Sequence, residues 1–253
     1  DWGSYLYIVL HAVDYREDEG VSTQELDVFM GKNYMVTHHD RSIEAVERVW
    51  NAIQRDDRHM KSGADHLLYR LVDELVASYL PVEDQLDLEI DLIENAIFGE
   101  WDASMLERLF LTKRSIINLR RILAPQREVL NKLARDELAV IDERDRIYFR
   151  DVYDHLVRLY EVTESMRDLV SGTMDTYLSM TNNRMNEVMK TLTVITTMFM
   201  PISFVASFFG MNFFQPSTPL DIWTGRPALW ITLIILLLTP LGMYAWMRRR
   251  RWM

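Results

Sequence analysis

The chain has 253 residues, of which 49% are hydrophobic and 26% charged, and its formal net charge is −10. This balance is typical of a chain that folds around a core, so extended disorder is excluded. The sequence has no cysteine, which fits a reducing compartment and excludes disulfide and thiolate-metal chemistry.

The first forty residues predict a small sheet. SYLYIVLHAV is aromatic and β-branched, and LDVFMGKNYMVTHH predicts two short strands around a turn at residues 31–33. Because the chain opens directly on a strand, we expect an α/β domain whose beginning lies upstream of Asp1.

Helices are expected next. RSIEAVERVWNAIQ is amphipathic, and residues 62–99 predict one longer helix with Ser62 as its cap, a kink at Pro81 and a stop at Gly99. Residues 103–131 predict a helix that runs back along it. Residues 1–140 are therefore expected to fold as helices beside a small sheet.

Residues 141–190 predict the stalk of a long helix. Between residues 144 and 190 there is no proline and one glycine, Gly172. Apolar residues recur there at spacings of three and four, a heptad-like seam: Tyr148, Val152, Leu156, Leu159, Val162, Met166 and Leu169. The pattern runs on into an apolar segment, which predicts one helix of ~90 Å at ~1.5 Å per residue. Pro201 is its first breaker and predicts a kink.

Two runs without charged residues, 191–214 and 228–247, each reach the ~20 residues that a membrane helix needs. The alternative, two buried core helices, is disfavoured by apolarity on all sides at this length. The predicted organisation is two spans joined by an external loop at 215–227. Arginines 248–251 place the tail 248–253 in the cytoplasm, and two spans then place both termini there.

A polar stripe follows one face of the long helix into the first span. Its members recur at spacings of three and four: Asp175, Ser179, Asn182 and Asn186, then Thr193, Thr196, Met200, Ser203 and Ser207. Two interpretations stay open: packing of small residues between helices, or the wall of a pore formed by several copies. An uncharged wall suits an ion that keeps its water, and Leu192 and Met189 would then close the pore by excluding water.

The segment YLSMTNNRMNEVMKTLTVITTMFMPISFVASFFGMNF resembles the pore helix of CorA-type magnesium/cobalt transporters, whose hallmark is Gly-Met-Asn at the outer end of the first span. DHLLYRLVDELV, PQREVL, YFRDVYDH and SGTMDTYLS extend the resemblance through the soluble part. The resemblance implies a membrane protein of the α+β class: a funnel-shaped homopentamer in the plasma (inner) membrane, with an α/β cytoplasmic domain, stalk helices and a pore lined by the first span.

The resemblance also implies roles for single residues. Gly210, Met211 and Asn212 correspond to the outer ion-entry motif. The pore-lining positions are Asn186, Met189, Leu192, Thr196, Met200, Ser203 and Ser207. Ser203 stands where threonine is frequent in the family, and Ser207 where glycine is common.

Magnesium gives up its waters reluctantly, so a selective mouth should recognise the hydrated ion. The side-chain carbonyl of Asn212 can accept hydrogen bonds from those waters without removing them.

A regulatory magnesium site is expected from carboxylates on the long helix. Asp151 resembles the acidic residue that binds magnesium between neighbouring cytoplasmic domains, although its usual partner would lie before Asp1. An oligomer would repeat Asp151 and Asp175 around its axis, and a divalent ion would bridge the clustered carboxylates. The alternative is that Asp151 pairs with Arg150 or Arg158.

The predicted function is passive influx of Mg²⁺, with Co²⁺ or Ni²⁺ as further ions, driven by the membrane potential and gated by internal magnesium. Two alternatives are a zinc-transporting relative, which usually has Ile where Met211 stands, and a non-conducting, membrane-anchored coiled-coil scaffold. A zinc site at His38, His39 and Asp40 would need a second cluster that the sequence does not show.

No phosphate-binding loop or catalytic constellation stands out, so an enzyme and an ATP-driven pump are both disfavoured, and no nucleic-acid partner is expected. The acidic run at 83–94 is interpreted as a solvated helix face that also attracts cations.

Overall fold

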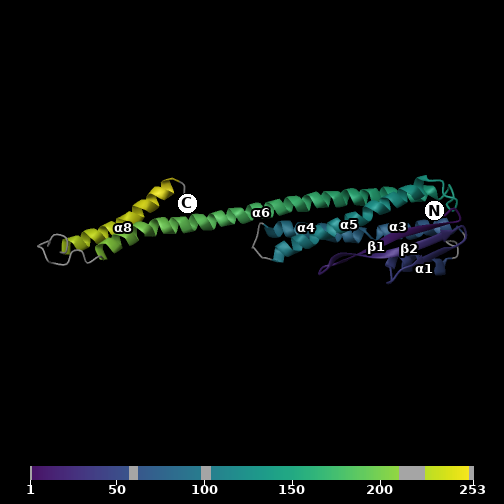
Figure 1. The fold of residues 1–253 in the computed structure, drawn as a ribbon, viewed down its shortest axis with the longest axis horizontal. Coiled ribbons are helices and arrows are strands. Elements are labelled where there is room, and N and C mark those ends of the chain that lie inside the picture. Colours follow the sequence, from purple (N-terminus) through teal and green to yellow (C-terminus); the bar gives the residue numbers. More distant parts are fainter. Residues whose placement is uncertain (1, 57–61, 98–103, 211–225, 251–253) are drawn as a thin grey trace. The chain divides into compact units, whose positions relative to one another are not determined.

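The computed structural model describes residues 2–56, 62–97, 104–210 and 226–250 of the chain (Figure 1). The chain forms two compact units, Asp1–Tyr177 and Leu178–Met253. The first unit holds all the described strands and the described helices that precede residue 146. The helix α6 (Arg146–Gly210) begins in the first unit and ends in the second, which also contains α8 (Arg226–Arg249).

The sheet has three antiparallel strands in the order β1-β2-β3, namely β1 (Tyr5–Arg16), β2 (Gly20–Gly31) and β3 (Met35–His38). The strand predictions are confirmed, but β1 also includes residues 14–16 and β2 also includes residues 20–25, which the sequence did not mark as strand. Their charged side chains point to solvent while the backbones pair. Gly20, with a φ of 73°, closes this hairpin, and a Cβ there would collide with Ser115 Oγ, which accepts a hydrogen bond from Val21 N at 3.1 Å.

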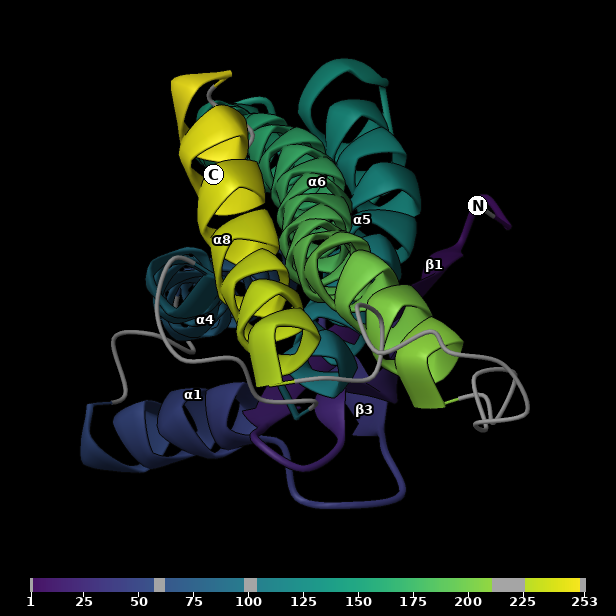
Figure 2. The ribbon, with the colours of Figure 1, turned by 90° about the vertical axis from the view of Figure 1, so that its left-hand side faces the viewer.

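Besides the first part of α6, the described residues of the first unit form the helices α1 (Glu44–Arg55), α3 (Ala64–Ala77), α4 (Leu80–Ile97) and α5 (Ser104–Arg135). Helices α3, α4 and α5 contact the sheet, and α1 packs on α3, on the side of the unit away from α5 (Figure 2). The predicted helices at 41–54 and 103–131 are confirmed as α1 and α5.

The prediction of one helix over 62–99 is wrong in its continuity, because the helix is interrupted at Ser78 and Tyr79, next to the predicted kink at Pro81. The Ser78 hydroxyl donates to the Leu75 carbonyl at 2.6 Å and ends α3. Pro81 then lies in the first turn of α4, where its missing N–H leaves no hydrogen bond unmade. The cap of α3 is Gly63, with a φ of 108°, and not Ser62. The predicted stop at Gly99 lies outside the described residues.

A buried tyrosine joins three elements of this unit. The Tyr79 side chain is 1% exposed, and its hydroxyl donates to the His11 carbonyl on β1 and lies 2.9 Å from Oε1 of Gln126 on α5. Burial raises the pKa of Tyr79, so it stays a neutral donor. The turn between α3 and α4 is thereby held against both the sheet and α5.

Helix α6 is continuous for 65 residues, as the uninterrupted pattern predicted, and it passes through Pro201. The predicted kink at Pro201 stays a prediction. The buried positions of its first part recur at spacings of three and four: Phe149, Val152, Leu156, Leu159, Thr163, Met166, Val170 and Thr173.

The predicted seam is therefore correct at four positions and wrong at Tyr148, Val162 and Leu169, which are 40% to 44% exposed. Buried threonines take part in the true seam because their hydroxyls are satisfied. Thr163 donates to the Leu159 carbonyl at 2.8 Å, and Thr173 lies 2.8 Å from Oε1 of Glu94 on α4.

Glu83 on α4 supports a prediction about pH. Its side chain is buried, and Oε1 has no hydrogen-bond partner among the described residues. Burial, followed by the charges of Asp84 and Asp87, raises the pKa of Glu83 from 4.5 to about 7. A raised pKa means that the folded state binds the proton more tightly, so this contribution to stability is complete below pH 4.5 and is lost as pH rises through 7.

We expect Glu83→Gln to remove this loss, so that the variant gains stability relative to the unmodified chain between pH 5 and pH 8. Chemical unfolding of the full chain in detergent, followed over this range, measures the difference. Glu128→Gln, at an exposed position on α5, is the control. Parallel pH profiles for Glu83→Gln and the unmodified chain would contradict the prediction.

Candidate pore face and family membership

Two helices of the described chain are long and apolar enough to cross a membrane, within Arg146–Phe208 and Trp230–Arg249. The most apolar stretch of the first has 0% of its residues buried, and that of the second 6%. Of the two charge-free runs predicted as spans, residues 191–210 lie in α6 and residues 228–247 lie in α8, while residues 211–214 lie outside the described residues. Apolar surface of this extent needs lipid or further protein to cover it.

The predicted pore residues lie on one face of α6. At ~100° per residue, the spacings from Asn186 to Gly210 confine them to about one third of the helix circumference. All of them are exposed in the single chain; Met189 and Leu192 are each 56% exposed and Met200 is 66% exposed. The stripe inferred from sequence is thus a single, unburied helix face.

The threonines of this stripe use their hydroxyl protons locally. Thr196 donates to the Leu192 carbonyl at 2.9 Å, and Thr193 donates to the Met189 carbonyl at 2.7 Å. A hydroxyl that donates to its own helix presents its remaining oxygen lone pairs outward. This part of the face therefore offers neutral hydrogen-bond acceptors.

Gly210 is the last residue of α6 and is exposed, whereas Met211 and Asn212 lie outside the described residues. A Cβ at Gly210 would meet nothing within 4 Å in the described chain. Contacts within this part of the chain therefore do not demand glycine at that position.

The two predicted regulatory carboxylates are exposed on α6, and they are not brought together in the single chain. The structure shows no ion pair of Asp151 with Arg150 or Arg158 in the part of the chain that it describes. Asp151 lies instead near Tyr69: burial raises the pKa of Tyr69, and Asp73 and Asp151 add to that rise while Arg70 opposes it.

Metal ligands do not converge elsewhere in the described residues, where no group of three or more His, Asp or Glu side chains is arranged to hold an ion. At the predicted His-His-Asp run, His39 Nδ1 contacts the Arg41 carbonyl at 2.7 Å, and His38 Nδ1 lies 3.6 Å from Asp27 Oδ2.

One polar cluster was not predicted from the sequence. Asp65 is buried on α3, and its carboxylate accepts hydrogen bonds from the backbone N of His66 and of Asp142, each at 3.0 Å. His66 Nδ1 lies 3.1 Å from Oδ1 of Asp145, the residue before α6, and burial raises the pKa of Asp145. The cluster anchors the start of α6 to α3. Its members are too far apart in sequence for any local pattern to link them.

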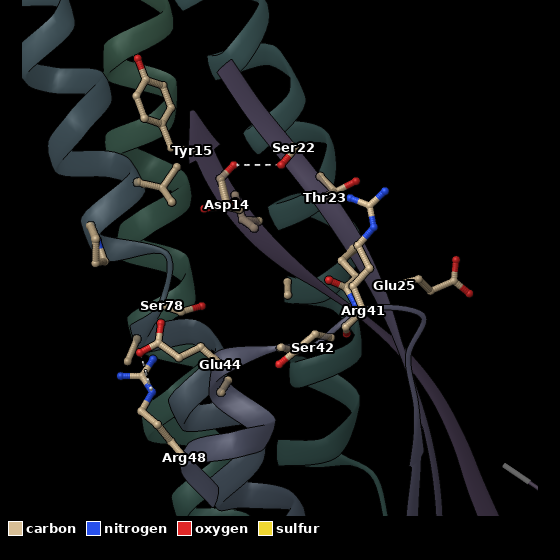
Figure 3. Close-up of a pocket in the computed structure, with 18 of the residues that line it drawn as sticks. Asp14, Tyr15, Ser22, Thr23, Glu25, Arg41, Ser42, Glu44, Arg48 and Ser78 are labelled. Atoms are coloured by element: carbon tan, nitrogen blue, oxygen red, sulfur yellow. Dashed lines mark hydrogen bonds and ion pairs between the residues drawn. The ribbon is translucent and has the colours of Figure 1, made fainter. Parts of the chain in front are cut away.

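The first unit also contains a cleft of about 870 Å³ between the β1-β2 hairpin and the start of α1 (Figure 3). Asp14 and Glu25 come from the strands, while Glu44 and Arg48 come from α1 and form an ion pair at 3.8 Å. Five carboxylates and two guanidinium groups line the cleft, so its lining is mainly acidic: Asp14, Glu17, Glu25, Asp40 and Glu44 against Arg41 and Arg48.

The sequence model of one protein family, described as CorA-like Mg²⁺ transporter protein, matches residues 1–249. The chain belongs to this family. The cobalt/magnesium transport protein CorA of Thermotoga maritima is 36% identical over 83% of the chain and 60% of its own length. The chain thus spans less than two thirds of that relative. The putative metal ion transporter YfjQ of Bacillus subtilis is 31% identical over 85% of the chain and 67% of its own length.

The complete structure of the CorA magnesium transporter from Methanocaldococcus jannaschii superimposes with a TM-score of 0.85 at 25% identity, covering 99% of the chain and 78% of that protein. The expected fold class is confirmed by this similarity: a soluble α/β part, a long helix and a C-terminal helix. These three relatives are transport proteins and not enzymes.

Proposed function

We propose that the protein conducts Mg²⁺ passively, with Co²⁺ and Ni²⁺ as further ions, through a pore lined by α6. The observation that carries the proposal is the uncharged face of α6, which crosses the apolar segment and ends at Gly210, the first residue of Gly-Met-Asn. Relatives named for cobalt and magnesium transport support this choice of ions.

A pore needs several copies of the chain, because two spans cannot enclose a water-filled path. We propose a homopentamer in the plasma (inner) membrane, with both termini cytoplasmic, in which each copy contributes the stripe from Asn186 to Gly210. No energy source other than the membrane potential is needed: it supplies ~2.3 kcal/mol per charge per 100 mV, and about twice that for a divalent ion.

Neutral acceptors match a cation that keeps its water shell. The waters around Mg²⁺ donate hydrogen bonds, and the lone pairs of Thr196 and the side-chain carbonyl of Asn212 accept them. A carboxylate at the same place would hold the ion too firmly for it to leave. Met189 and Leu192, both apolar and on the same face, form rings that close the path when water leaves it.

Regulation is proposed to act through Asp151 and Asp175. Repeated around an axis, these exposed carboxylates repel each other unless a divalent cation neutralises them. High internal magnesium would then hold neighbouring copies together in a closed state, by its higher affinity for that state.

Zinc transport is the second candidate, because the zinc transport protein ZntB of Yersinia enterocolitica is 26% identical over 95% of the chain. Met211 favours magnesium over zinc, since zinc-transporting relatives usually have Ile there. Uptake of Mg²⁺ and Zn²⁺ by proteoliposomes decides between the two ions, and uptake of neither would favour the non-conducting scaffold.

We expect Asn212→Ala to abolish Mg²⁺ uptake by proteoliposomes while the oligomer stays intact on size-exclusion chromatography, because the amide is the group that recognises the hydrated ion. Asn51→Ala, at an exposed position on α1, is the control and should transport normally. Normal uptake by a correctly assembled Asn212→Ala variant would refute the assignment of the pore mouth.

We expect Leu192→Asn to increase Mg²⁺ leak at high internal magnesium, because a polar side chain lets water enter the constriction. Leu192→Met keeps the position apolar and should leave the leak unchanged. Flux measured with a magnesium-sensitive dye inside liposomes distinguishes them. An unchanged or smaller leak in Leu192→Asn argues against an apolar gate at this level.

We expect Mg²⁺ to protect the soluble unit from proteolysis. Asp151→Lys should make the digestion rate less dependent on Mg²⁺, because the lysine ammonium group supplies the positive charge that the bridging Mg²⁺ would otherwise supply. Asp136→Lys, at an exposed position after α5, is the matched control. The readout is the rate of limited digestion with and without Mg²⁺. Equal rates in the unmodified protein would show that Asp151 has no such role.

A further inference from the structure

The last turn of α8 carries a cluster of exposed guanidinium groups beside an indole ring. Arg248, Arg249 and Arg250 are all exposed, and Trp246 is 51% exposed. Cζ of Arg250 lies 5.9 Å from the centroid of the Trp246 ring, a cation–π contact. These four residues form the Arg-Trp cluster.

Among the described residues of the second unit, carboxylates do not neutralise this cluster. The acidic side chains of residues 178–253 are Glu187 and Asp221, and the basic ones are Arg184, Lys190, Arg226 and the arginines 248–251. Among the residues that the structure describes, no ion pair involves Arg248, Arg249 or Arg250. Within the described part of its own unit, the positive charge therefore has no carboxylate partner.

The position of the cluster along α8 indicates which partner that is. Residues 228–247 carry no charge, and side chains such as Trp230, Leu237 and Leu241 are more than half exposed. Trp246 lies at the end of this apolar run and the three arginines of the cluster follow it directly, which in a membrane is the depth of the lipid phosphates. Tryptophan favours the same depth, because its ring is apolar and its N–H is polar.

We propose that the Arg-Trp cluster binds the phosphodiester groups of anionic phospholipids in preference to zwitterionic ones. A guanidinium donates two parallel hydrogen bonds to a phosphate, and its stacking on the indole fixes its orientation. An anionic lipid brings net negative charge to the cluster, whereas the phosphate of phosphatidylcholine is already balanced by choline. The carbonyl ends of α8 add to the stabilisation of positive charge there. This inference does not depend on ion conduction.

The test uses the full chain in vesicles with equal amounts of phosphatidylglycerol and phosphatidylcholine. The protein is extracted in mild detergent, and the phospholipids that remain bound are quantified by mass spectrometry. We expect phosphatidylglycerol to be enriched about tenfold over the vesicle ratio. The triple variant Arg248→Gln, Arg249→Gln, Arg250→Gln should retain both lipids near the vesicle ratio.

The matched control removes the same charge from exposed positions of α5, as Arg114→Gln, Arg121→Gln and Arg135→Gln, and should keep the enrichment. A second variant, Arg248→Lys, Arg249→Lys, Arg250→Lys, keeps the positive charge and is the control in case the Gln variant misfolds. It should keep a smaller enrichment, because lysine lacks the planar fork.

Three results would overturn the proposal: no enrichment in the unmodified protein, full enrichment in the triple Gln variant, or equal loss in the α5 control. The first result would leave carboxylates of a neighbouring copy as the partner of the cluster.

Discussion

The structure depends on one long helix, α6, which satisfies its own backbone groups along its length except where Pro201 has no N–H to donate. A helix satisfies its own amides, so it can pass from a packed protein face to an apolar surface without exposing unpaired polar groups. The threonine hydroxyls are also satisfied within the helix, because Thr163, Thr193 and Thr196 donate to carbonyls one turn back. What changes along α6 is the burial of its side chains: the first part of the helix carries a buried seam, and the part from Asn186 to Gly210 carries an exposed face.

The first unit contacts α6 through hydrogen bonds, an ion pair and ring stacking at successive positions along the helix. At its start, His66 and Asp145 join it to α3, and Tyr69 stacks on Tyr148 at a centroid distance of 4.9 Å. Further along, Glu164 pairs with Arg120 of α5, and Thr173 meets Glu94 of α4. Because hydrogen-bonding partners must align, these contacts fix the rotation of α6 more narrowly than apolar packing does.

Charge is arranged by function along the second unit. The proposed ion path is neutral, since hydrated divalent cations pass groups that accept hydrogen bonds without holding the ion. Net charge appears where the apolar run of α8 ends, in Arg248, Arg249 and Arg250. Both features follow from one rule: a charged side chain is stable where water or phosphate can solvate it. The proposed path is therefore uncharged, and the arginines lie where the apolar run of α8 ends.

The sequence by itself determined the features set by local periodicity: α1, α5, the uninterrupted α6, the two apolar runs and the stripe that shares one face. Its Gly-Met-Asn motif and the surrounding residues were enough to indicate the family. Tertiary structure decided the turn at Ser78, the pairing of residues 14–16 with residues 20–22 and the buried seam that includes Phe149, Thr163 and Val170. It also brought Asp65, His66 and Asp145 together. In each case the deciding partner lies far away in the chain, and burial with a satisfied hydrogen bond outweighs the local preference for polarity or helix continuation.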